Sequence, residues 1–161
     1  MGESANIIKL AEAVRESTLK RLKLVPFDLI EWRPTPDSMS FADIARHLVK
    51  CDLWLFDLLA GKEMQDIQGE INPERIETEA EYQALFEGLI ESGKKRLEIF
   101  TWLSDSDLAG LHIDPRFGEC SVWWSIVRGC LDHEAHHRGQ IAVYLKMNGL
   151  GFKSQVSSAN D

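Results

Sequence analysis

Hydrophobic residues recur along most of this chain at the three-and-four spacing of amphipathic helices. The spacing predicts four helices, over residues 4–23, 40–59, 78–103 and 121–148. The second and third predicted helices each begin with a capping box, in which a hydroxyl group and a carboxylate satisfy free backbone amides. These pairs are Ser40 with Asp43 and Thr78 with Glu81.

The connections between these helices differ in length and composition. Residues 61–77 form a long polar crossover between the second and third helices. Residues 104–108 predict one more helical turn, residues 109–121 are rich in turn signals, and the two-residue alternation of strands is nearly absent. We therefore predict an all-α fold, an antiparallel four-helix bundle with one long crossover between helices 2 and 3. Residues 1–150 are expected to form this single domain, and residues 151–161 a frayed C-terminal tail.

Histidines interrupt the apolar stripes of two predicted helices. The stripe of the fourth helix contains Ile126, Cys130, His133, His137 and Ile141, and that of the second contains Ile44, His47, Cys51 and Trp54. Burying polar nitrogens without partners costs on the order of 1–3 kcal/mol. Side chains four residues apart on a helix have Cβ atoms about 5–6 Å apart, so two imidazoles can bind one ion. We predict that His47, His133 and His137 bind a divalent metal. The alternative is that His47 is a hydrogen-bonded core histidine and that the other two pair with carboxylates.

The sequence HEAHH, residues 133–137, also matches H-E-x-x-H, a zinc-protease signature in which Glu134 is the general base. The extended signature needs a histidine where Val143 stands, and no glutamate follows that supplies a third ligand. We therefore expect no protease activity, and we expect Glu134 to face solvent. His136 is interpreted as a solvated helix residue and His112 as a loop residue.

Other residues near the histidines have simpler interpretations. Cys51 and Cys130 lie one turn from histidines on the same stripes and are interpreted as packing residues, although both can also line a metal site. Asp43 and Asp132 are candidates for orienting the imidazoles, but we interpret them as surface charges. Gly139 interrupts the fourth helix and is expected to permit close approach of another helix.

Composition narrows the classes of function. The chain has 161 residues and a formal net charge of −8, which argues against nucleic-acid binding because phosphate contacts need basic patches. Its apolar runs are shorter than the roughly 20 residues that span a bilayer, so we expect no membrane association. The three cysteines contain no CxxC pair, and the N-terminus lacks the pattern of a secretory signal. These features favour a cytoplasmic protein.

Two segments of the chain resemble a known family. SFADIARHLVKCDLW, followed after the crossover by DHEAHHRGQIAVYLKMNG, resembles the DinB / YfiT-like family of helical-bundle metalloenzymes. The resemblance implies a four-helix bundle with one long crossover, which is often a homodimer. It also implies a divalent ion, commonly nickel or zinc, held by histidines that match His47, His133 and His137. Relatives in the family include S-transferases that use a low-molecular-weight thiol such as bacillithiol or mycothiol.

These observations lead to one main functional hypothesis. The expected function is that of a metal-dependent enzyme acting on a small molecule, with a reaction like that of the thiol S-transferases. The alternatives are a metal-dependent hydrolase and a metal-binding bundle without catalytic activity. Beyond the three metal ligands, the sequence assigns no catalytic residue.

Overall fold

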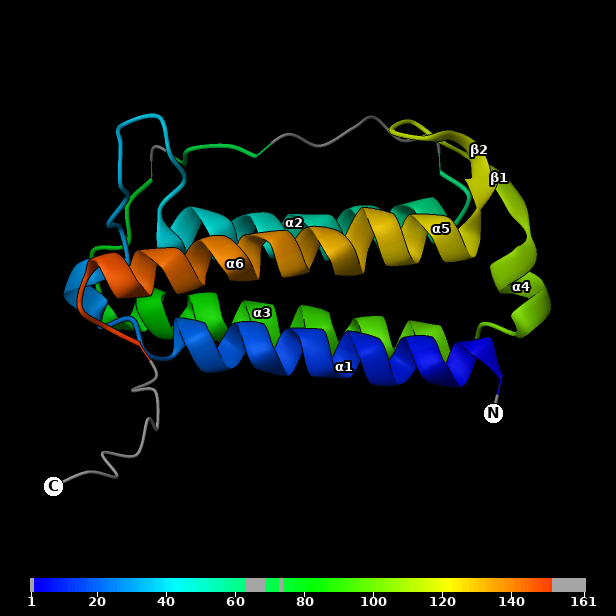
Figure 1. Cartoon of the computed structure of the whole chain (residues 1–161), viewed down its shortest axis with the longest axis horizontal. Helices are drawn as coiled ribbons and strands as arrows, with labels where there is room; N and C mark the ends of the chain where they lie inside the picture. The colour runs from blue at the N-terminus through cyan, green and yellow to red at the C-terminus, as the bar shows by residue number, and fades with distance from the viewer. Residues whose placement is uncertain (1, 63–68, 73, 152–161) are drawn as a thin grey trace, which may run out of the picture.

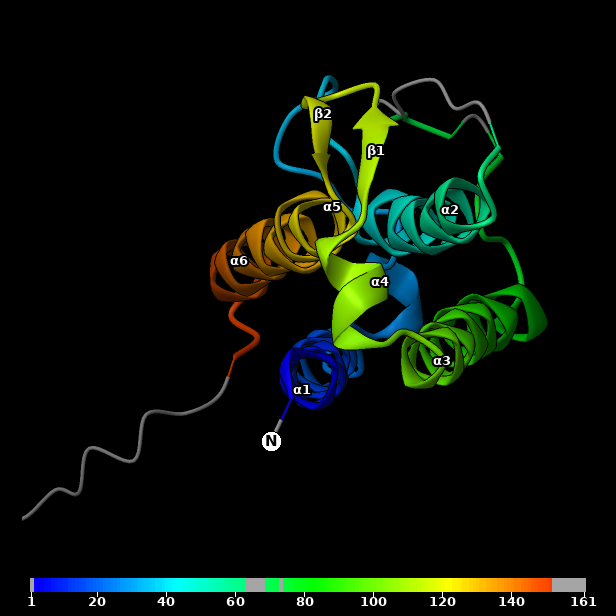
Figure 2. The same ribbon diagram turned by 90° about the vertical axis from the view of Figure 1, so that its right-hand side faces the viewer.

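The computed structural model describes residues 2–62, 69–72 and 74–151. Long helices run side by side along the molecule in two layers (Figures 1 and 2). They are α1 (Glu3–Leu22), α2 (Phe41–Leu59), α3 (Glu79–Thr101) and a last helix in three parts, α5 (Val122–Ile126), a π-helical segment (Val127–Leu131) and α6 (Asp132–Met147). The predicted helical bundle is confirmed. Residues 152–161 of the predicted tail lie outside the described residues.

The crossover determines the directions of the helices. α3 begins at the same end of the bundle as α2, so α2 and α3 run in the same direction while α1 and α6 run in the opposite one (Figure 1). Each helix of one direction therefore lies beside one partner of the other direction, α1 beside α3 and α2 beside α6 (Figure 2). None of the described helices is long and apolar enough to cross a bilayer.

The helix starts follow the predicted capping boxes. Ser40 with Asp43 begins α2, and Thr78 with Glu81 begins α3, with both reciprocal hydrogen bonds formed in each box. The interpretation of Asp43 as a surface charge is wrong. Its side chain is buried. The carboxylate accepts hydrogen bonds from the Ser40 and Asn72 amides and lies 3.0 Å from the Arg33 guanidinium, so its charge is compensated. Asp132 is exposed, as expected.

A short β-hairpin was not predicted from the sequence. After α4 (Asp105–Ala109), the strands β1 (Leu111–Asp114) and β2 (Gly118–Ser121) pair antiparallel, with Leu111 opposite Ser121. The interpretation of His112 as a loop residue is therefore wrong, because His112 lies on β1. The hairpin is easily missed because its apolar side chains point outward, where Leu111 and Ile113 are 70% and 69% exposed.

The hydrophobic core is divided into two clusters along the bundle. The first contains Leu22, Ile44, Leu48, Leu89 and Ile141, and the second contains Ile7, Trp54, Leu58, Phe100 and Ile126. On every long helix, buried polar residues stand between the members of the two clusters: Arg15 and Thr18 on α1, His47 and Asp52 on α2, Ser92 and Arg96 on α3, Glu134 and His137 on α6. The middle of the bundle is therefore polar, which is where the predicted metal ligands lie.

Candidate metal centre

The three predicted ligands meet between α2 and α6. The His47 Nε2 atom lies 2.8 Å from His133 Nε2, and His137 Nε2 lies 2.9 Å from the same atom. His47 and His137 are buried, whereas His133 is half-buried. One ring nitrogen of each histidine thus points at a common position, and a single ion there can be bound by all three.

The positions of the protons on these rings favour binding of a metal over hydrogen bonds among the three imidazoles. His137 Nδ1 lies 2.7 Å from Gln140 Oε1. Because this amide oxygen only accepts, His137 Nδ1 donates its proton and the Nε2 atom of the neutral ring carries a bare lone pair. A single proton on His133 Nε2 cannot satisfy both neighbouring nitrogens, so the cluster is short of protons. A cation satisfies all three lone pairs at once.

The electrostatics keep the imidazoles neutral, the form that binds metals. Burial lowers the pKa of His47 to about 4, and the neighbouring His133 and Lys50 lower it further. Burial also lowers the pKa of His137 to about 4, against the opposing effect of its hydrogen bond to Gln140. Near pH 7 these two rings are therefore neutral, so an incoming ion does not compete with a second ring proton.

A π-helical segment, Val127–Leu131, directly precedes α6, which carries the two candidate ligands His133 and His137. A π turn contains one residue more than an α turn, so it rotates the side chains that follow by about 100° around the helix axis. Arg116 Nη1 donates a hydrogen bond of 2.8 Å to the Gly129 carbonyl in this segment. A Cβ atom on Gly129 would lie 2.2 Å from Arg116 Nη2, so glycine is required while Arg116 occupies this place.

The two cysteines of the stripes have different surroundings. Cys51 Sγ lies 3.5 Å from His47 Nε2, so this thiol borders the candidate site. Burial, together with the nearby Cys130 and Asp52, raises the pKa of Cys51 well above its usual value, which keeps it a neutral thiol. Cys130 instead contacts Arg96 Nη1 at 3.6 Å, away from the imidazoles.

The expectation that Glu134 faces solvent is wrong. Its side chain is buried, and it accepts hydrogen bonds of 2.8 Å from Arg15 Nε and from Arg96 Nη1. Burial raises the pKa of Glu134, but the hydrogen bonds and charges of the two arginines outweigh this effect and lower the pKa to about 2. Glu134 is therefore held as a carboxylate by two cations, which excludes it as the general base of an H-E-x-x-H protease.

Glu134 belongs to a buried ion network to which all four long helices contribute, defined here as the arginine–carboxylate network. Its members are Arg15, Asp52, Ser92, Arg96 and Glu134. The network was not predicted from the sequence, although the sequence contains an indication of it: Arg15 on α1 and Arg96 on α3 each stand on an apolar stripe. The network has two arginines and two carboxylates, so its formal charge is zero.

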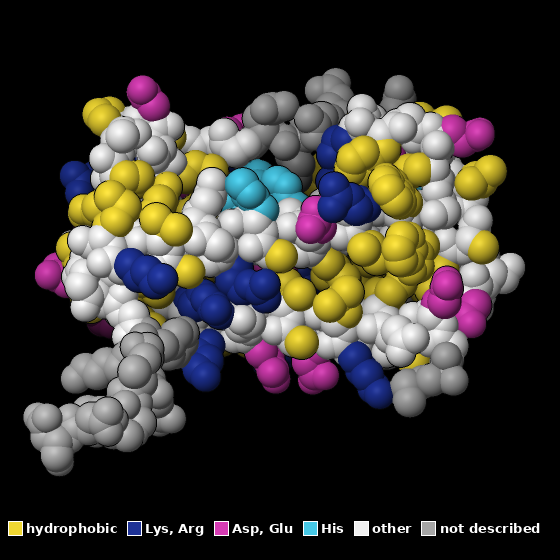
Figure 3. Space-filling view, viewed as in Figure 1, with side chains coloured by type: hydrophobic (Ala, Val, Ile, Leu, Met, Phe, Trp, Pro, Cys, Tyr) yellow, Lys and Arg dark blue, Asp and Glu magenta, His cyan; other side chains and the backbone are white. Residues whose placement is uncertain are grey.

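Other residues of the fourth helix face outward. His136 is exposed, as expected. Gly139 is also exposed, and a Cβ atom placed on it would meet no atom within 4 Å, so the expectation of a close helix approach there is wrong. Histidine side chains gather at one place on the face of the molecule along which α6 runs (Figure 3). His133 is half-buried, so part of its side chain is exposed to solvent.

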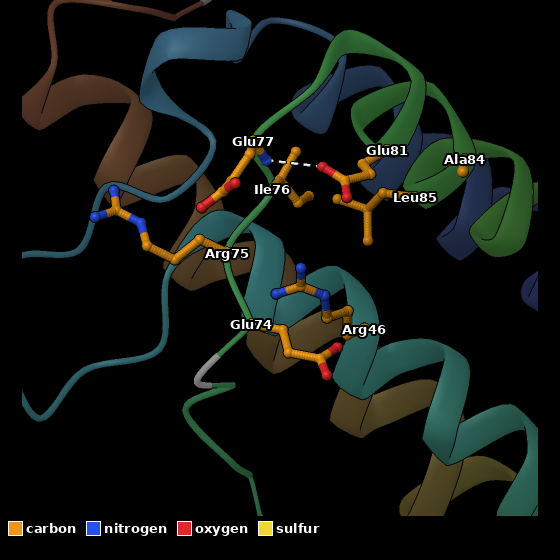
Figure 4. A pocket seen from close by; sticks show the side chains of 8 residues that line it. All are labelled: Arg46, Glu74, Arg75, Ile76, Glu77, Glu81, Ala84 and Leu85. Atoms are coloured by element: carbon orange, nitrogen blue, oxygen red, sulfur yellow. Dashed lines mark hydrogen bonds between the residues drawn. The ribbon is translucent and has the colours of Figure 1, made fainter.

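A separate pocket of about 630 Å³ lies where the crossover meets α2 and α3 (Figure 4). It is lined by Arg46, Glu74, Arg75, Ile76, Glu77, Glu81, Ala84 and Leu85. None of these residues belongs to the histidine cluster. The lining residues include both positive and negative side chains. The Glu77 amide donates a hydrogen bond to the Glu81 carboxylate.

Fold and site together define a class of protein: a four-helix bundle with a three-histidine candidate metal centre in its polar middle. The sequence pattern of the DinB superfamily matches residues 10–141, so the chain belongs to this superfamily. A search of curated proteins gave no match.

Solved structures agree with this assignment. A DinB-like protein from Bacillus subtilis is 18% identical over 89% of this chain and 92% of its own, with a TM-score of 0.65. A DinB-like protein from Bacillus cereus is 20% identical over 87% of this chain and 89% of its own, also with a TM-score of 0.65. At these identities the likeness supports the shared fold.

Proposed function

We propose that the protein is a metal-dependent enzyme that uses a low-molecular-weight thiol as co-substrate and transfers its sulfur to a small electrophilic molecule. The observation that carries the proposal is the convergence of the His47, His133 and His137 Nε2 atoms, which lack enough protons to satisfy one another. Three imidazoles leave coordination positions free on a divalent ion, as in catalytic sites. Nickel and zinc are the proposed ions, since imidazole suits both.

A bound divalent ion supplies Lewis acidity, which lowers the pKa of a coordinated thiol or water to near neutrality. In the proposed reaction the thiol would release its proton to solvent, its sulfur would form a bond to an electrophilic carbon, and the leaving group would depart from that carbon with the bonding electron pair. The protein contributes the three ligands, and Gln140 holds His137 in the tautomer that presents Nε2. Cys51 borders the site as a neutral thiol.

The surroundings of the cluster favour thiol transfer over hydrolysis. Glu134, the carboxylate adjacent to His133 in the chain, is fixed between Arg15 and Arg96 and is not free to take a proton from water. Glu70, whose negative charge acts on the pKa of His47, is exposed, and its Oε2 atom lies 2.8 Å from Lys50 Nζ. A coordinated thiol is acidic enough to ionise without such a base, whereas metal-dependent hydrolysis commonly uses one.

The test is an activity screen with nickel-loaded and zinc-loaded protein, electrophilic substrates and a panel of low-molecular-weight thiols. We expect turnover that requires the thiol and disappears in His47→Ala. The matched control is Cys51→Ser, which alters the thiol next to His47 but retains all three ligands and is expected to keep activity. Turnover without thiol would favour the hydrolase alternative, and bound metal without turnover would favour a non-catalytic metal-binding bundle.

We also propose that the protein forms a homodimer through the end of the bundle that carries the hairpin. Leu111, Ile113, Phe117 and Trp124 are exposed there, and Figure 3 shows hydrophobic side chains gathered on this part of the surface. Exposed apolar groups in such a cluster are typical of protein contacts. Sedimentation equilibrium is expected to give a dimer for the parent and a monomer for Ile113→Lys. A monomeric parent would contradict this proposal.

A further inference from the structure

The β1–β2 hairpin has its polar face turned toward the protein. Leu111 and Ile113 point to solvent, whereas Asp114 is completely buried and His112 is half-buried. Cys120 stands directly opposite His112 in the register of the two strands. A hairpin with four-residue strands is marginal by itself, and this one does not gain stability by burying its apolar side chains. Its polar side chains must therefore hold it to the bundle.

These side chains converge on Ser125, a buried residue of α5. The Ser125 hydroxyl donates to Asp114 Oδ2 at 2.7 Å, and His112 Nε2 lies 2.7 Å from the same hydroxyl oxygen. Cys120 Sγ lies 3.4 Å from it. One imidazole nitrogen, one thiol sulfur and one carboxylate oxygen thus lie within 4.8 Å of one another.

We propose that His112, Asp114 and Cys120 form a second binding site for a divalent transition metal of the zinc type, which fixes the hairpin to α5. Zinc accepts nitrogen, sulfur and oxygen ligands, with bonds of about 2.0–2.3 Å in a tetrahedral arrangement. Donors around such an ion are roughly 3.3–3.8 Å apart by that geometry. The three donors lie within 4.8 Å of one another, so binding requires them to draw closer and the Ser125 hydroxyl, 2.7 Å from both His112 Nε2 and Asp114 Oδ2, to turn away.

Arg116 prepares the carboxylate for this role. Its Nε donates to Asp114 Oδ1 at 3.0 Å and its Nη2 donates to Asp114 Oδ2 at 2.8 Å. The guanidinium is itself held by the Gly129 carbonyl and stacks over the Trp54 ring at 3.9 Å. Groups that are hydrogen-bonded to a metal ligand fix the orientation of that ligand, and Arg116 fixes Asp114 in this way. The ion would replace the Ser125 hydrogen bond on Oδ2.

The protons balance in this binding step. Because Ser125 donates to Asp114, His112 Nε2 carries the proton of the His112–Ser125 hydrogen bond in the metal-free protein. Binding moves that proton to Nδ1 by tautomerisation, which leaves the ring neutral. The Cys120 thiol releases its own proton to solvent as the sulfur–metal bond forms. One proton is therefore released for each ion bound.

Cobalt(II) is the probe that separates this site from the three-histidine site. A cobalt–thiolate bond gives a sulfur-to-metal charge-transfer band in the near ultraviolet, which imidazole ligands alone do not give. The His47→Ala/His137→Ala double variant lacks the first site and is titrated with Co²⁺ beside the parent. We expect about two ions per parent chain and about one per double-variant chain, with the thiolate band present in both.

The cysteine variants identify the sulfur. Adding Cys120→Ser to the double variant is expected to abolish the band and the remaining ion, whereas adding Cys51→Ser is expected to leave both. Circular dichroism confirms that each variant is helical. A double variant that binds no Co²⁺, or a thiolate band that survives Cys120→Ser, would overturn the proposal. These outcomes do not depend on activity or on the three-histidine site.

Discussion

Two buried polar layers lie next to each other in this bundle, and they differ in whether their ionisable groups are paired within the protein. Both layers draw on the same helices: His47 and Asp52 are five residues apart on α2, and His133 and Glu134 are consecutive on α6. In the arginine–carboxylate network, both carboxylates accept hydrogen bonds from both arginines. In the histidine cluster, three lone pairs compete for too few protons.

The difference separates a structural role from a binding role. Buried charges are stable only when they are paired and hydrogen-bonded, and the network meets this condition with the protein's own groups. The histidine cluster is neutral, and its converging ring nitrogens all find a partner only when a cation is bound. We therefore expect changes in the network to reduce folding stability, and changes in the cluster to reduce metal binding.

The largest effect is expected from Glu134→Ala, which leaves the Arg15 and Arg96 charges buried without their shared partner. Removing one member of a buried ion network costs about 3–5 kcal/mol of unfolding free energy. Urea-induced unfolding followed by circular dichroism measures this loss, and Glu134→Gln provides a milder variant of similar shape. His47→Gln is the control from the other layer and should change metal-free stability by about 1 kcal/mol or less. Equal losses in both layers would contradict the separation of roles.

A smaller effect, on metal binding alone, is expected from Gln140→Ala. Without the acceptor on Nδ1, His137 is no longer held in the tautomer that presents Nε2. Loss of such an outer partner typically lowers metal affinity by about 10–100-fold. Competition titration with a chelator measures the affinity. Gln140→Glu keeps an acceptor at the same place and should restore binding, and an affinity unchanged by Gln140→Ala would show that His137 needs no orienting partner.

A matched pair of glycine substitutions tests the link between the hairpin and the π segment. In Gly129→Ala the new methyl group would lie 2.2 Å from Arg116 Nη2, and we expect a destabilisation of about 1–3 kcal/mol as Arg116 is displaced. Gly139→Ala meets no atom within 4 Å and should stabilise the helix by up to about 1 kcal/mol. Thermal unfolding distinguishes the two, and a harmless Gly129→Ala would mean that Arg116 does not hold this segment.

The last effect is a graded dependence of stability on pH. The arginines hold the pKa of Glu134 at about 2, below its usual value of 4.5. Ionised Glu134 therefore stabilises the fold above pH 4.5, and this stabilisation is lost as the pH falls from 4.5 toward about 2. Unfolding free energies measured across this window should decline more steeply for the parent than for Glu134→Gln. Parallel curves would mean that folding does not lower the pKa of Glu134.

The sequence predicted the helices and the convergence of the three histidines because both depend on local spacing. The four-residue spacing of His133 and His137, and the position of all three histidines on apolar stripes, were enough to predict that they meet between the helices. The position of Glu134 was predicted wrongly because its partners, Arg15 and Arg96, come from two other helices. Spacing along one helix carries no information about such partners.

Two backbone features were also missed for physical reasons. The hairpin reverses the usual arrangement, with Leu111 outside and Asp114 inside, so its pattern does not indicate a buried strand. The π segment, Val127–Leu131, leaves the apolar periodicity on either side nearly intact. Neither feature depends on a local propensity strong enough to be recognised in the sequence.

The most direct test of the central claim, that the histidine layer binds a metal while the arginine–carboxylate network does not, is elemental analysis of protein without a histidine tag. The parent, His47→Ala/His137→Ala and Glu134→Gln are each reconstituted with nickel or zinc and freed of excess ion. We expect the double variant to hold one bound ion fewer than the parent, and Glu134→Gln to hold as many as the parent. Equal metal content in the parent and the double variant would contradict it.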